Sequence, residues 1–483
     1  MNPEFLHRLQ ASLPEDTVLV GEEACRVYEC DGLSAYRQIP DIVAVPHEAE
    51  QLSRIVRLCH EYEVSMVPRG AGTGLSGGAL PQAGSILISL ARFNRIIEIN
   101  PHQRIARVQP GVRNLAISEA ARPFNLFYAP DPSSQIACSI GGNVAENSGG
   151  VHCLKYGLTI HNVIGLRIML SDGEELVLDD TSLDGYGYDL LALMHGSEGL
   201  LAFVTEVTVQ LLPMPERVVV VMAAFDSVVS AGQAVADIVA SGVIPAGLEL
   251  MDNASIRASE DYAAAGYPRD AAALLLCEID GEGREVDEYV KVVGSCLESS
   301  NARSIRLAED EVDRARLWAG RKAAFPAVGR ISPDYYCMDG TIPRHALPEV
   351  LEGIQCLSDE YGLRVANVFH AGDGNLHPLI LYDANIPGEL QKTEEMGGRI
   401  LELCLGVGGS ITGEHGVGVE KLDQMCLQFN QDELCQFHAL KEAFDPQGLL
   451  NPGKAVPSLH RCAEFGAMHV HAGNLPFPDI PRF

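Results

Sequence analysis

Two histidines bracket a glycine-rich turn in the C-terminal half of the chain. Residues 367–377 read N-V-F-H-A-G-D-G-N-L-H, with His370 and His377 on either side of Gly372 and Gly374. Glycine at this density disfavours a helix, so we expect the two imidazoles to converge through a loop. Histidines in such turns also cap and hydrogen-bond neighbouring backbone, and the sequence leaves that interpretation open.

A second motif supplies a carboxylate and a third imidazole. Residues 412–418 read T-G-E-H-G-V-G and contain Glu414 and His415. Two histidines and one glutamate suit a divalent metal ion with an open position for substrate. We therefore predict a metal site at His370, His377 and Glu414, which leaves His415 available as a base.

The elements that position these residues begin with a strand–helix–strand pattern. A short apolar run starts at Asp41, apolar residues then recur at helical spacing through 52–59, and V-S-M-V-P closes the unit. This pattern predicts a parallel pair of strands with a crossover helix. It leads directly into the sequence 69–78, which reads R-G-A-G-T-G-L-S-G-G.

The glycine-rich run 69–78 is a candidate phosphate-binding loop. Its glycines let backbone N–H groups approach a pyrophosphate, and Thr73 and Ser76 add hydroxyl donors. A strand-like S-I-L-I-S-L follows instead of a helix, so the run is not the nicotinamide-dinucleotide fingerprint, and it lacks the lysine of a P-loop. A flexible turn is the alternative.

A β-rich stretch follows, with two predicted hairpins. One joins 96–100 to 105–109, and the other turns at Asp172-Gly173. Between them lies a second glycine-rich cluster, I-G-G-N-V-A-E-N-S-G-G at 140–150, followed by K-Y-G at 155–157. Small residues in such number let a flat ring and a ribityl chain lie against the backbone.

Residues from about 39 to 213 resemble the FAD-binding domain of the vanillyl-alcohol-oxidase, or PCMH, flavoprotein superfamily. Four clusters carry the resemblance in order: the run at 68–78, the run at 141–150, K-Y-G, and G-S-E-G at 196–199. The resemblance implies non-covalent FAD, so we do not expect attachment at His152 or Cys153. The implied FAD-binding residues are Pro68, Arg69, Gly70, Ala71, Gly72, Thr73, Gly74, Ser76, Gly77, Pro132, Ser133, Gly141, Gly142, Asn143, Asn147, Gly150, Tyr156, Gly157, Glu198 and Asn451.

The second half alternates strands with helices. Strands are predicted at 218–225, 246–251 and 273–279, with helices at 227–241, 253–264 and 284–299 on one face of the sheet, so this part reads as α+β. A further helix at 309–324 carries Arg321, which we expect to bind a substrate carboxylate because a guanidinium can bind it in a bidentate manner. A solvated charged face with Trp318 in the core is the alternative.

The predicted fold is therefore α+β, with a two-part PCMH-type FAD-binding domain, a ferredoxin-like α+β substrate domain and a helical C-terminal segment. The expected divisions are an N-terminal segment 1–38, the FAD-binding domain 39–215, the substrate domain 216–410, a segment 411–457 returning to the flavin site, and an irregular tail 458–483 that contains Cys462, His469 and His471.

H-A-G-D-G-N-L-H and G-E-H-G-V-G together resemble the D-2-hydroxy-acid dehydrogenase branch of the superfamily. The resemblance implies zinc or manganese at His370, His377 and Glu414, with His415 as the base. When His415 takes the proton of a metal-bound hydroxyl, we expect the α hydrogen to leave as hydride to flavin N5. The sequence Y-Y-C-M-D-G-T-I-P at 335–343 resembles the FAD subunits of glycolate oxidases. That family implies a complex with a second flavin-type subunit and an iron–sulfur subunit.

The substrate expectation depends on three apolar positions. Branch members that oxidise dicarboxylates resemble this chain but carry polar residues where Phe325, Cys337 and Leu379 stand here, and apolar side chains cannot pair a second buried charge. A short acid such as glycolate or D-lactate is therefore favoured. The alternatives from other classes are a metallohydrolase, a non-haem iron oxygenase, and a non-catalytic subunit that keeps the flavin fold as a scaffold.

Bulk composition limits the partners. The chain has 35 Lys+Arg against 65 Asp+Glu, a net charge of −30, which repels nucleic acid and anionic lipid surfaces. The alternative interpretation of the acidic excess is that it only increases solubility. Its 13 cysteines include no C-x-x-C, so no iron–sulfur motif is encoded. The N-terminus lacks a secretory signal, and we expect a cytoplasmic protein that reaches the inner membrane only through partner subunits.

Overall fold

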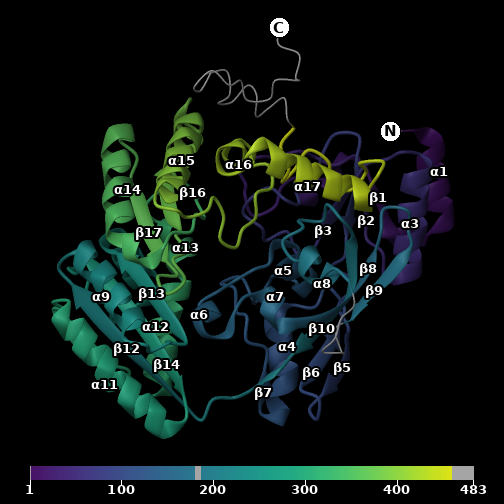
Figure 1. Cartoon of the computed structure of the whole chain (residues 1–483). Coiled ribbons are helices and arrows are strands. Elements are labelled where there is room, and N and C mark those ends of the chain that lie inside the picture. The colour runs from purple at the N-terminus through teal and green to yellow at the C-terminus, as the bar shows by residue number, and fades with distance from the viewer. Residues whose placement is uncertain (1, 180–186, 459–483) are drawn as a thin grey trace. The chain divides into compact units, whose positions relative to one another are not determined.

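The computed structural model describes residues 2–179 and 187–458 (Figure 1). The described residues form two compact units: the first holds 2–148, 158–179, 187–213 and 414–458, and the second holds 149–157 and 214–413. This division differs from the expected one in two places, because 1–38 belongs to the first unit and 149–157 to the second. The tail residues Cys462, His469 and His471 lie outside the described residues.

One sheet of the first unit has four short strands in the order β1-β2-β4-β3. These are β1 (Val18–Val20), β2 (Ile42–Ala44), β4 (Ile86–Ser89) and β3 (Met66–Arg69). β2 and β3 both pair in parallel with β4, so the prediction that they are neighbours is wrong: β4 lies between them. The crossover helix α3 (Ala49–Glu61) has the predicted apolar face, which is buried. β1 pairs with β2, which ties the N-terminal segment into this unit.

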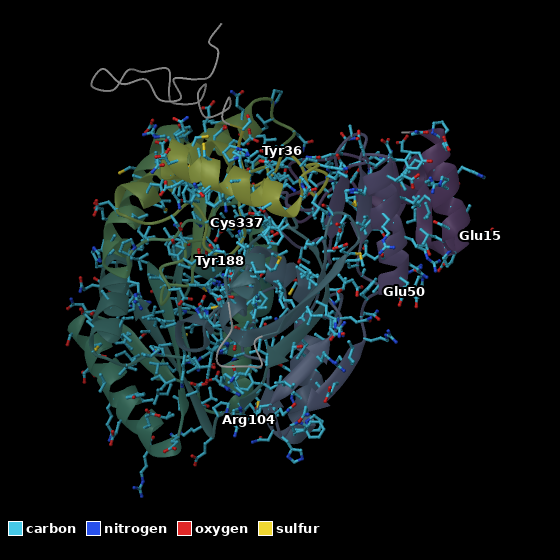
Figure 2. The ribbon with its side chains drawn as sticks, turned by 45° about the vertical axis from the view of Figure 1, so that its right-hand side comes forward. Glu15, Tyr36, Glu50, Arg104, Tyr188 and Cys337 are labelled. Carbon is cyan, nitrogen blue, oxygen red and sulfur yellow. The ribbon has the colours of Figure 1, made fainter. Side chains whose placement is uncertain are left out.

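The other large sheet of the first unit is antiparallel, in the order β5-β6-β10-β8-β9. Its strands are β5 (Ile96–Asn100), β6 (Ile105–Val108), β10 (Phe203–Gln210), β8 (Val163–Met169) and β9 (Glu175–Asp179). Both predicted hairpins are confirmed, as β5–β6 and β8–β9. Arg104, labelled in Figure 2, lies at the turn of the first hairpin. Its φ is +55°. Alternate residues of β10 are buried, which is the pattern of a strand with one face on a core.

Short helices and the C-terminal segment complete the first unit. Its remaining elements are α1 (Pro3–Ser12), α2 (Glu22–Cys25), α4 (Asn114–Ala121), α5 (Ile140–Glu146), α7 (Thr159–Asn162), α8 (Leu190–Met194), α16 (Leu422–Gln428), α17 (Gln431–Phe444) and the strand pair β7 (Leu126–Phe127) and β11 (Leu212–Pro213). Met66 forms a parallel bridge with Leu450. Leu450 also shares a core cluster with Phe5 and Leu9, so both ends of the described chain help to build this core.

The second unit is built on a seven-stranded antiparallel sheet in the order β15-β12-β14-β13-β17-β18-β16. The strands are β12 (Arg217–Phe225), β13 (Gly247–Asp252), β14 (Ala273–Gly281), β15 (Ser304–Leu307), β16 (Asp334–Cys337), β17 (Val365–Phe369) and β18 (Pro378–Tyr382). With the crossover helices α9 (Val228–Ala240) and α11 (Gly283–Ser299), the first four strands form a β-α-β-β-α-β unit. The predicted ferredoxin-like α+β architecture is confirmed.

Helices cover both faces of this sheet (Figure 1), so the expectation of helices on one face is wrong. α9, α11, α14 (Leu347–Tyr361) and α15 (Glu389–Gly406) lie on one side, where Gly397 of α15 packs on Met338. The other side carries α6 (Cys153–Tyr156), α10 (Asn253–Ala263), α12 (Glu311–Lys322) and α13 (Ala324–Val328). Both layers are needed because eight successive residues of β14 are buried. No helix in the described residues is long and apolar enough to span a bilayer.

Candidate functional site

His370 and His377 converge in the second unit. His370 directly follows β17 and His377 directly precedes β18, and these two strands are antiparallel neighbours. The ring centroids are 5.0 Å apart with the planes at 84°. Both side chains are buried. The loop-mediated convergence expected from the glycine-rich motif is therefore present.

The turn between the two histidines is fixed by its backbone. The amide of Gly374 donates a hydrogen bond to the carbonyl of His370 at 3.1 Å, and the amide of Ile342 donates to the carbonyl of Gly374 at 2.9 Å. Gly374 has φ +77°, and a Cβ there would collide with the carbonyl oxygen of Ile342. Only glycine fits this position, because the conformation and the close approach both exclude a side chain.

Glu249 of β13 joins His370 to Arg321. Its Oε1 lies 2.8 Å from Nδ1 of His370, and its Oε2 accepts a hydrogen bond from Nε of Arg321 at 2.8 Å. The Arg321 and Glu249 side chains are each 1% exposed. Burial acts to raise the pKa of Glu249, but the electrostatic and hydrogen-bond contributions of His370 and Arg321 outweigh it and lower that pKa. The carboxylate is therefore ionised and orients both partners.

This contact assigns the two nitrogens of His370 to different tasks. With Nδ1 donating to a carboxylate, Nε2 is the nitrogen suited to bind a metal ion. Carboxylate–histidine pairs of this kind commonly support metal ligands because they fix the ring and its tautomer. Glu249 was not predicted as a site residue, since a single glutamate in an apolar strand carries no motif.

Asp339 is a second carboxylate that sequence reasoning missed. It is fully buried, and its Oδ1 lies 3.6 Å from Nε2 of His377. Its Oδ2 accepts hydrogen bonds from the Thr412 hydroxyl at 2.7 Å and the Gly413 amide at 3.0 Å. The available signal was its place in the motif at 335–343. Asp339 thus anchors the end of the segment that carries Glu414, the residue after Gly413.

The donor set in the second unit fits a divalent cation. Ligand-type atoms of His370 and His377 lie within 4.8 Å of one another, as do those of Asp339 and His377. Imidazole nitrogen with carboxylate oxygen suits zinc or manganese. Glu414, the third predicted ligand, directly follows Gly413, whose amide donates to Asp339. The peptide bond sets the distance between the Cα atoms of Gly413 and Glu414 at about 3.8 Å.

Arg321 has one guanidinium edge that is not used by Glu249. Among the described residues, its Nη1 is buried without a hydrogen-bond partner, and a buried donor in that state is costly. A ligand carboxylate or another anion would satisfy it. The predicted carboxylate-binding role of Arg321 fits this geometry, whereas the alternative of a solvated charged face does not fit a buried side chain.

Apolar and aromatic residues surround His377. The Phe325 ring centroid lies 6.0 Å from that of His377 and 6.2 Å from that of Tyr335. Cys337 and Leu379 are direct partners in the β16–β18 register, and both are buried. The three positions that bear on substrate size are therefore brought together on the His377 side of the sheet.

In the first unit, the glycine-rich run leaves β3 and approaches the start of α5 closely. A Cβ at Gly70 would collide with the Ser139 hydroxyl, which caps α5 by accepting from the Gly142 amide at 3.3 Å. A Cβ at Gly77, which has φ +78°, would lie 2.5 Å from Cγ2 of Val419. No helix follows the run, as predicted.

Several predicted cofactor residues of this unit carry buried polar atoms without hydrogen-bond partners among the described residues. These are Oγ of Ser76, Nδ2 of Asn143 and Oδ1 of Asn451. Each needs a partner when water is excluded. The first unit therefore fits a polar ligand that approaches the glycine-rich loops, as a dinucleotide would.

Other predicted cofactor residues are engaged by the protein itself. Nη1 of Arg69 donates to the carbonyl of Cys30 at 2.8 Å, which braces the loop against the N-terminal segment. The Asn147 side chain accepts from the Ile160 amide at 3.0 Å. Pro132 and Ser133 lie in the loop between β7 and α5. The hydrogen bonds of Arg69 and Asn147 therefore stabilise the conformation of these loops.

Glu198 holds the segment that follows His415. Its two carboxylate oxygens accept from the amides of Val417 at 2.8 Å and Gly418 at 2.7 Å. Burial raises the pKa of Glu198, although both amides act against that shift. The Glu198 carboxylate, which was predicted to bind the cofactor, thus accepts hydrogen bonds from the backbone close to His415.

Lys454 is a further buried group that the prediction omitted, although it ends the motif L-L-N-P-G-K at 449–454. Its Nζ donates to the carbonyls of Gly78 at 2.9 Å and Leu80 at 2.5 Å, at the end of the glycine-rich run. Burial lowers the pKa of Lys454 to about 7. The protonated form of Lys454 would favour an anionic ligand at this loop.

Comparison with known families gives two matches. Residues 40–179 match the family model described as "FAD binding domain", and residues 214–455 match "FAD linked oxidases, C-terminal domain". The chain is 63% identical over 478 residues to the "Glycolate oxidase subunit GlcD" of Escherichia coli K12, covering 99% of this chain and 96% of that protein.

More distant relatives extend the comparison. The protein of the same name from Bacillus subtilis is 38% identical, with 89% of this chain and 91% of that protein covered. A "D-lactate dehydrogenase" from Anaerostipes hadrus is 30% identical, with 94% and 97% covered.

Solved structures support the fold. The structure of 4-ethylphenol oxidase from Gulosibacter chungangensis aligns with a TM-score of 0.80 at 19% identity, covering 95% of this chain and 98% of that one. That of p-cresol methylhydroxylase aligns with a TM-score of 0.79 at 17% identity, covering 95% and 97%. The predicted two-part PCMH-type fold is confirmed.

Proposed function

Because this chain belongs to the FAD-linked oxidases, we propose that it oxidises a short D-2-hydroxy acid, with glycolate, which becomes glyoxylate, as the favoured substrate. The observation that carries the proposal is the buried Arg321–Glu249–His370 arrangement. It offers an unsatisfied guanidinium donor to a carboxylate beside two imidazoles suited to a metal. A 2-hydroxy acid carries the complementary groups, a carboxylate and an adjacent hydroxyl.

The residues of the chain divide the reaction between them. Arg321 binds the substrate carboxylate, and His370, His377 and Glu414 would hold a zinc or manganese ion. Such an ion lowers the pKa of a bound hydroxyl group. His415 then takes the hydroxyl proton, for which an imidazole has a suitable pKa near neutral pH.

The first unit would bind FAD through its glycine-rich loops and the buried polar atoms of Ser76, Asn143 and Asn451. Bound FAD supplies the acceptor, at flavin N5, for the α hydrogen that leaves as hydride. Glu198 keeps the backbone beside His415 in place through the two amides that it accepts. Gly70 lets the loop approach the start of α5, because a Cβ there would collide with the Ser139 hydroxyl.

Phe325, Cys337 and Leu379 restrict the substrate to a short acid. A second carboxylate beside these apolar side chains would be buried without a partner, which is costly. Glycolate is favoured because the relatives at 63% and 38% identity are named glycolate oxidase subunits. D-Lactate is the second candidate, supported by the relative named D-lactate dehydrogenase.

We place the chain in a complex, since those relatives are named as subunits. The proposed partners are a second flavin-type subunit and an iron–sulfur subunit that carries electrons onward. The absence of any C-x-x-C in the sequence fits this division of labour. Contact with the inner membrane, in this proposal, occurs only through those partners.

Anaerobic titration of the FAD- and zinc-loaded protein tests the reaction. Glycolate is expected to bleach the visible flavin spectrum, D-lactate to do so if the pocket admits a methyl group, and D-2-hydroxyglutarate to leave it unchanged. Comparable reduction by D-2-hydroxyglutarate would overturn the short-acid assignment. A flavin spectrum unchanged by both short acids would overturn the proposed reaction.

His415→Ala separates a catalytic chain from a non-catalytic scaffold. The variant is expected to keep FAD and to lose nearly all flavin reduction by glycolate, because no other predicted base remains. His345→Ala is the matched control, since His345 is an exposed histidine of the second unit. Full activity of a His415→Ala complex would assign the chemistry to another subunit.

A further inference from the structure

Three buried carboxylates project from one face of the sheet in the second unit. Glu249 of β13 is the register partner of Leu276 in β14, and Glu278 and Asp280 follow Leu276 at two and four residues. Strand residues two apart share a face, so the three acids form a row across adjacent strands. Their exposures are 1%, 6% and 5%. Buried charges at this density call for specific partners.

Glu278 contacts two separate elements. Its Oε2 accepts a hydrogen bond from the indole N–H of Trp318 at 2.5 Å, and its Oε1 lies 3.0 Å from Nε2 of His152. Trp318 and Arg321 are three residues apart on α12, hence on one face of that helix. Glu249 and Glu278 therefore fasten α12 to the sheet at two points, and Glu278 also fastens the segment 149–157.

Asp280 provides the second polar anchor for this segment. It accepts a hydrogen bond from the hydroxyl of Tyr156 at 2.5 Å and forms an ion pair with Lys155. Nζ of Lys155 also donates to the carbonyl of Asp280 at 2.6 Å. Burial, together with the Asp280 carboxylate, raises the pKa of Tyr156, so its hydroxyl remains a donor.

Two glycines let the same segment pack closely on the sheet. A Cβ at Gly247 would lie 2.8 Å from Cγ1 of Val151, and one at Gly372 would lie 2.7 Å from Cδ2 of Leu154. Gly372 belongs to the turn between the two site histidines. The segment 149–157 is thus held by both polar and apolar contacts to the face that carries Arg321 and His370.

We propose that Glu278 is a positioning residue, which holds the segment 149–157 and the Arg321 helix in one fixed arrangement. The inference rests on the proposed function, because the segment contains Gly150, Tyr156 and Gly157, which are predicted to contact FAD. Its ends are bonded to Ser148 and Leu158 of the first unit. Glu278 acts through His152 and Trp318, the two side chains that it contacts.

The choice of a charged residue supports this role. A buried carboxylate with two directional partners contributes little net stability compared with an apolar residue of similar size, but it defines orientation. An apolar residue at 278 could fill the space between Trp318 and His152. It could not fix the angle of either ring.

Glu278→Gln in the holoenzyme tests the proposal, since glutamine keeps the volume and removes the charge. We expect the rate constant for flavin reduction at saturating glycolate to fall about tenfold, because a small misplacement of reacting groups is sufficient for such a loss. The glycolate concentration for half-maximal reduction should change little, since Arg321 keeps its contact with Glu249. FAD affinity is expected to fall several-fold.

Asp313→Asn is the matched control for stability. Asp313 is a buried carboxylate of α12 whose hydrogen bonds go to Arg306, Arg316 and the amide of Glu309. Asp313→Asn should lower the melting temperature about as much as Glu278→Gln does. It should leave the rate of flavin reduction and the FAD affinity unchanged. Wild-type reduction rate and wild-type FAD affinity in Glu278→Gln would overturn the proposal, whatever its melting temperature.

Trp318→Phe is the second variant in case Glu278→Gln does not fold. It removes the indole donor to Glu278 and keeps an aromatic ring. It is expected to slow flavin reduction, as Glu278→Gln does. An unchanged rate in a folded Trp318→Phe protein would count against the role of the pair. If glycolate, D-lactate and other 2-hydroxy acids fail to bleach wild-type flavin, the proposed function fails, while FAD affinity still decides the role of Glu278.

Discussion

At the residue scale, the second unit depends on a carboxylate that bridges two functional side chains. Glu249 contacts both His370 and Arg321, and all three are buried. Taking a charge out of water is costly, and removing one partner of a buried pair leaves the other uncompensated. The arrangement is therefore stable only as a unit, and each member affects the geometry of the others.

Arg321→Lys is expected to lower kcat/KM for glycolate by roughly tenfold to a hundredfold. The ammonium can keep the ion pair with Glu249 but loses the planar fork that offers a second edge to a carboxylate. A charge-assisted hydrogen bond contributes about 1.5–3 kcal/mol, which corresponds to that range. Arg314→Lys on the same helix is the control, since Arg314 pairs only weakly with exposed Glu311. Steady-state kinetics with unchanged kcat/KM in Arg321→Lys would contradict the assigned role.

Lys454 predicts a pH-dependent stability in the FAD-free protein. Burial lowers its pKa to about 7 from 10.5, against the opposing influence of Asp31, Glu198 and Glu146. Between these two values the unfolded chain binds a proton that the folded chain lacks, so stability rises with pH through this window. Below about pH 7 both states are protonated, and the cost of burying the charge is fully present.

Lys454→Met removes this titration, and denaturant unfolding at several pH values measures its effect. The free energy of unfolding of the wild type is expected to increase relative to the variant from about pH 7 upwards, by at most about 1.4 kcal/mol per pH unit. Parallel pH profiles for the two proteins would show that Lys454 titrates normally in the folded state.

At the element scale, the turn between β17 and β18 determines whether the two histidines can meet. Its geometry depends on backbone hydrogen bonds to residues 340 and 342 and on glycine at 374. The strands themselves are fixed by the sheet. The turn is therefore the element in which a small change is expected to have a large effect on the site.

Gly374→Ala is expected to destabilise the protein by about 2 kcal/mol or more, because it combines a left-handed backbone conformation with a collision against the Ile342 carbonyl. Zinc content after purification should fall with it. Gly294→Ala is the control, since a Cβ at this position of α11 meets nothing within 4 Å. It should stabilise the helix by up to about 1 kcal/mol. Similar effects of the two substitutions in chemical denaturation would contradict the steric argument.

At the scale of the whole molecule, the N-terminal segment is part of the first unit. β1 pairs with β2, Phe5 and Leu9 are fully buried in its core, and the carbonyl of Cys30 accepts from Arg69. The expected boundary at residue 38 would have cut through these contacts. Residues near both ends of the described chain pack into the core of this unit. Its stability therefore depends on the N-terminal segment as well as on the C-terminal one.

Leu9→Ala is expected to reduce the free energy of unfolding by about 2–5 kcal/mol, the usual cost of removing a large aliphatic side chain from a core. Val27→Ala is the matched control in the same segment, because Val27 is 77% exposed and its truncation should have little effect. Thermal melting of both variants provides the measurement. Equal melting temperatures would mean that the segment is only loosely attached.

The sequence by itself determined the local features of this protein. Apolar spacing in 52–59 predicted the buried face of α3, hairpin signals predicted β5–β6 and β8–β9, and glycine density predicted that His370 and His377 meet through a loop. These predictions succeeded because propensity, periodicity and turn chemistry act over a few residues.

Only the tertiary structure decided which charges are paired. Glu249 lies 121 residues from His370 and 72 from Arg321, and Glu278 lies 126 from His152. A lone carboxylate in an apolar strand has no local pattern, so its partners become known only when strand register places them opposite one another. Asp339 lies in the motif at 335–343, but its partners His377, Thr412 and Gly413 also become known only from the packed structure. The cost of burying a charge requires a partner, but only the packed sheet specifies which residue it is.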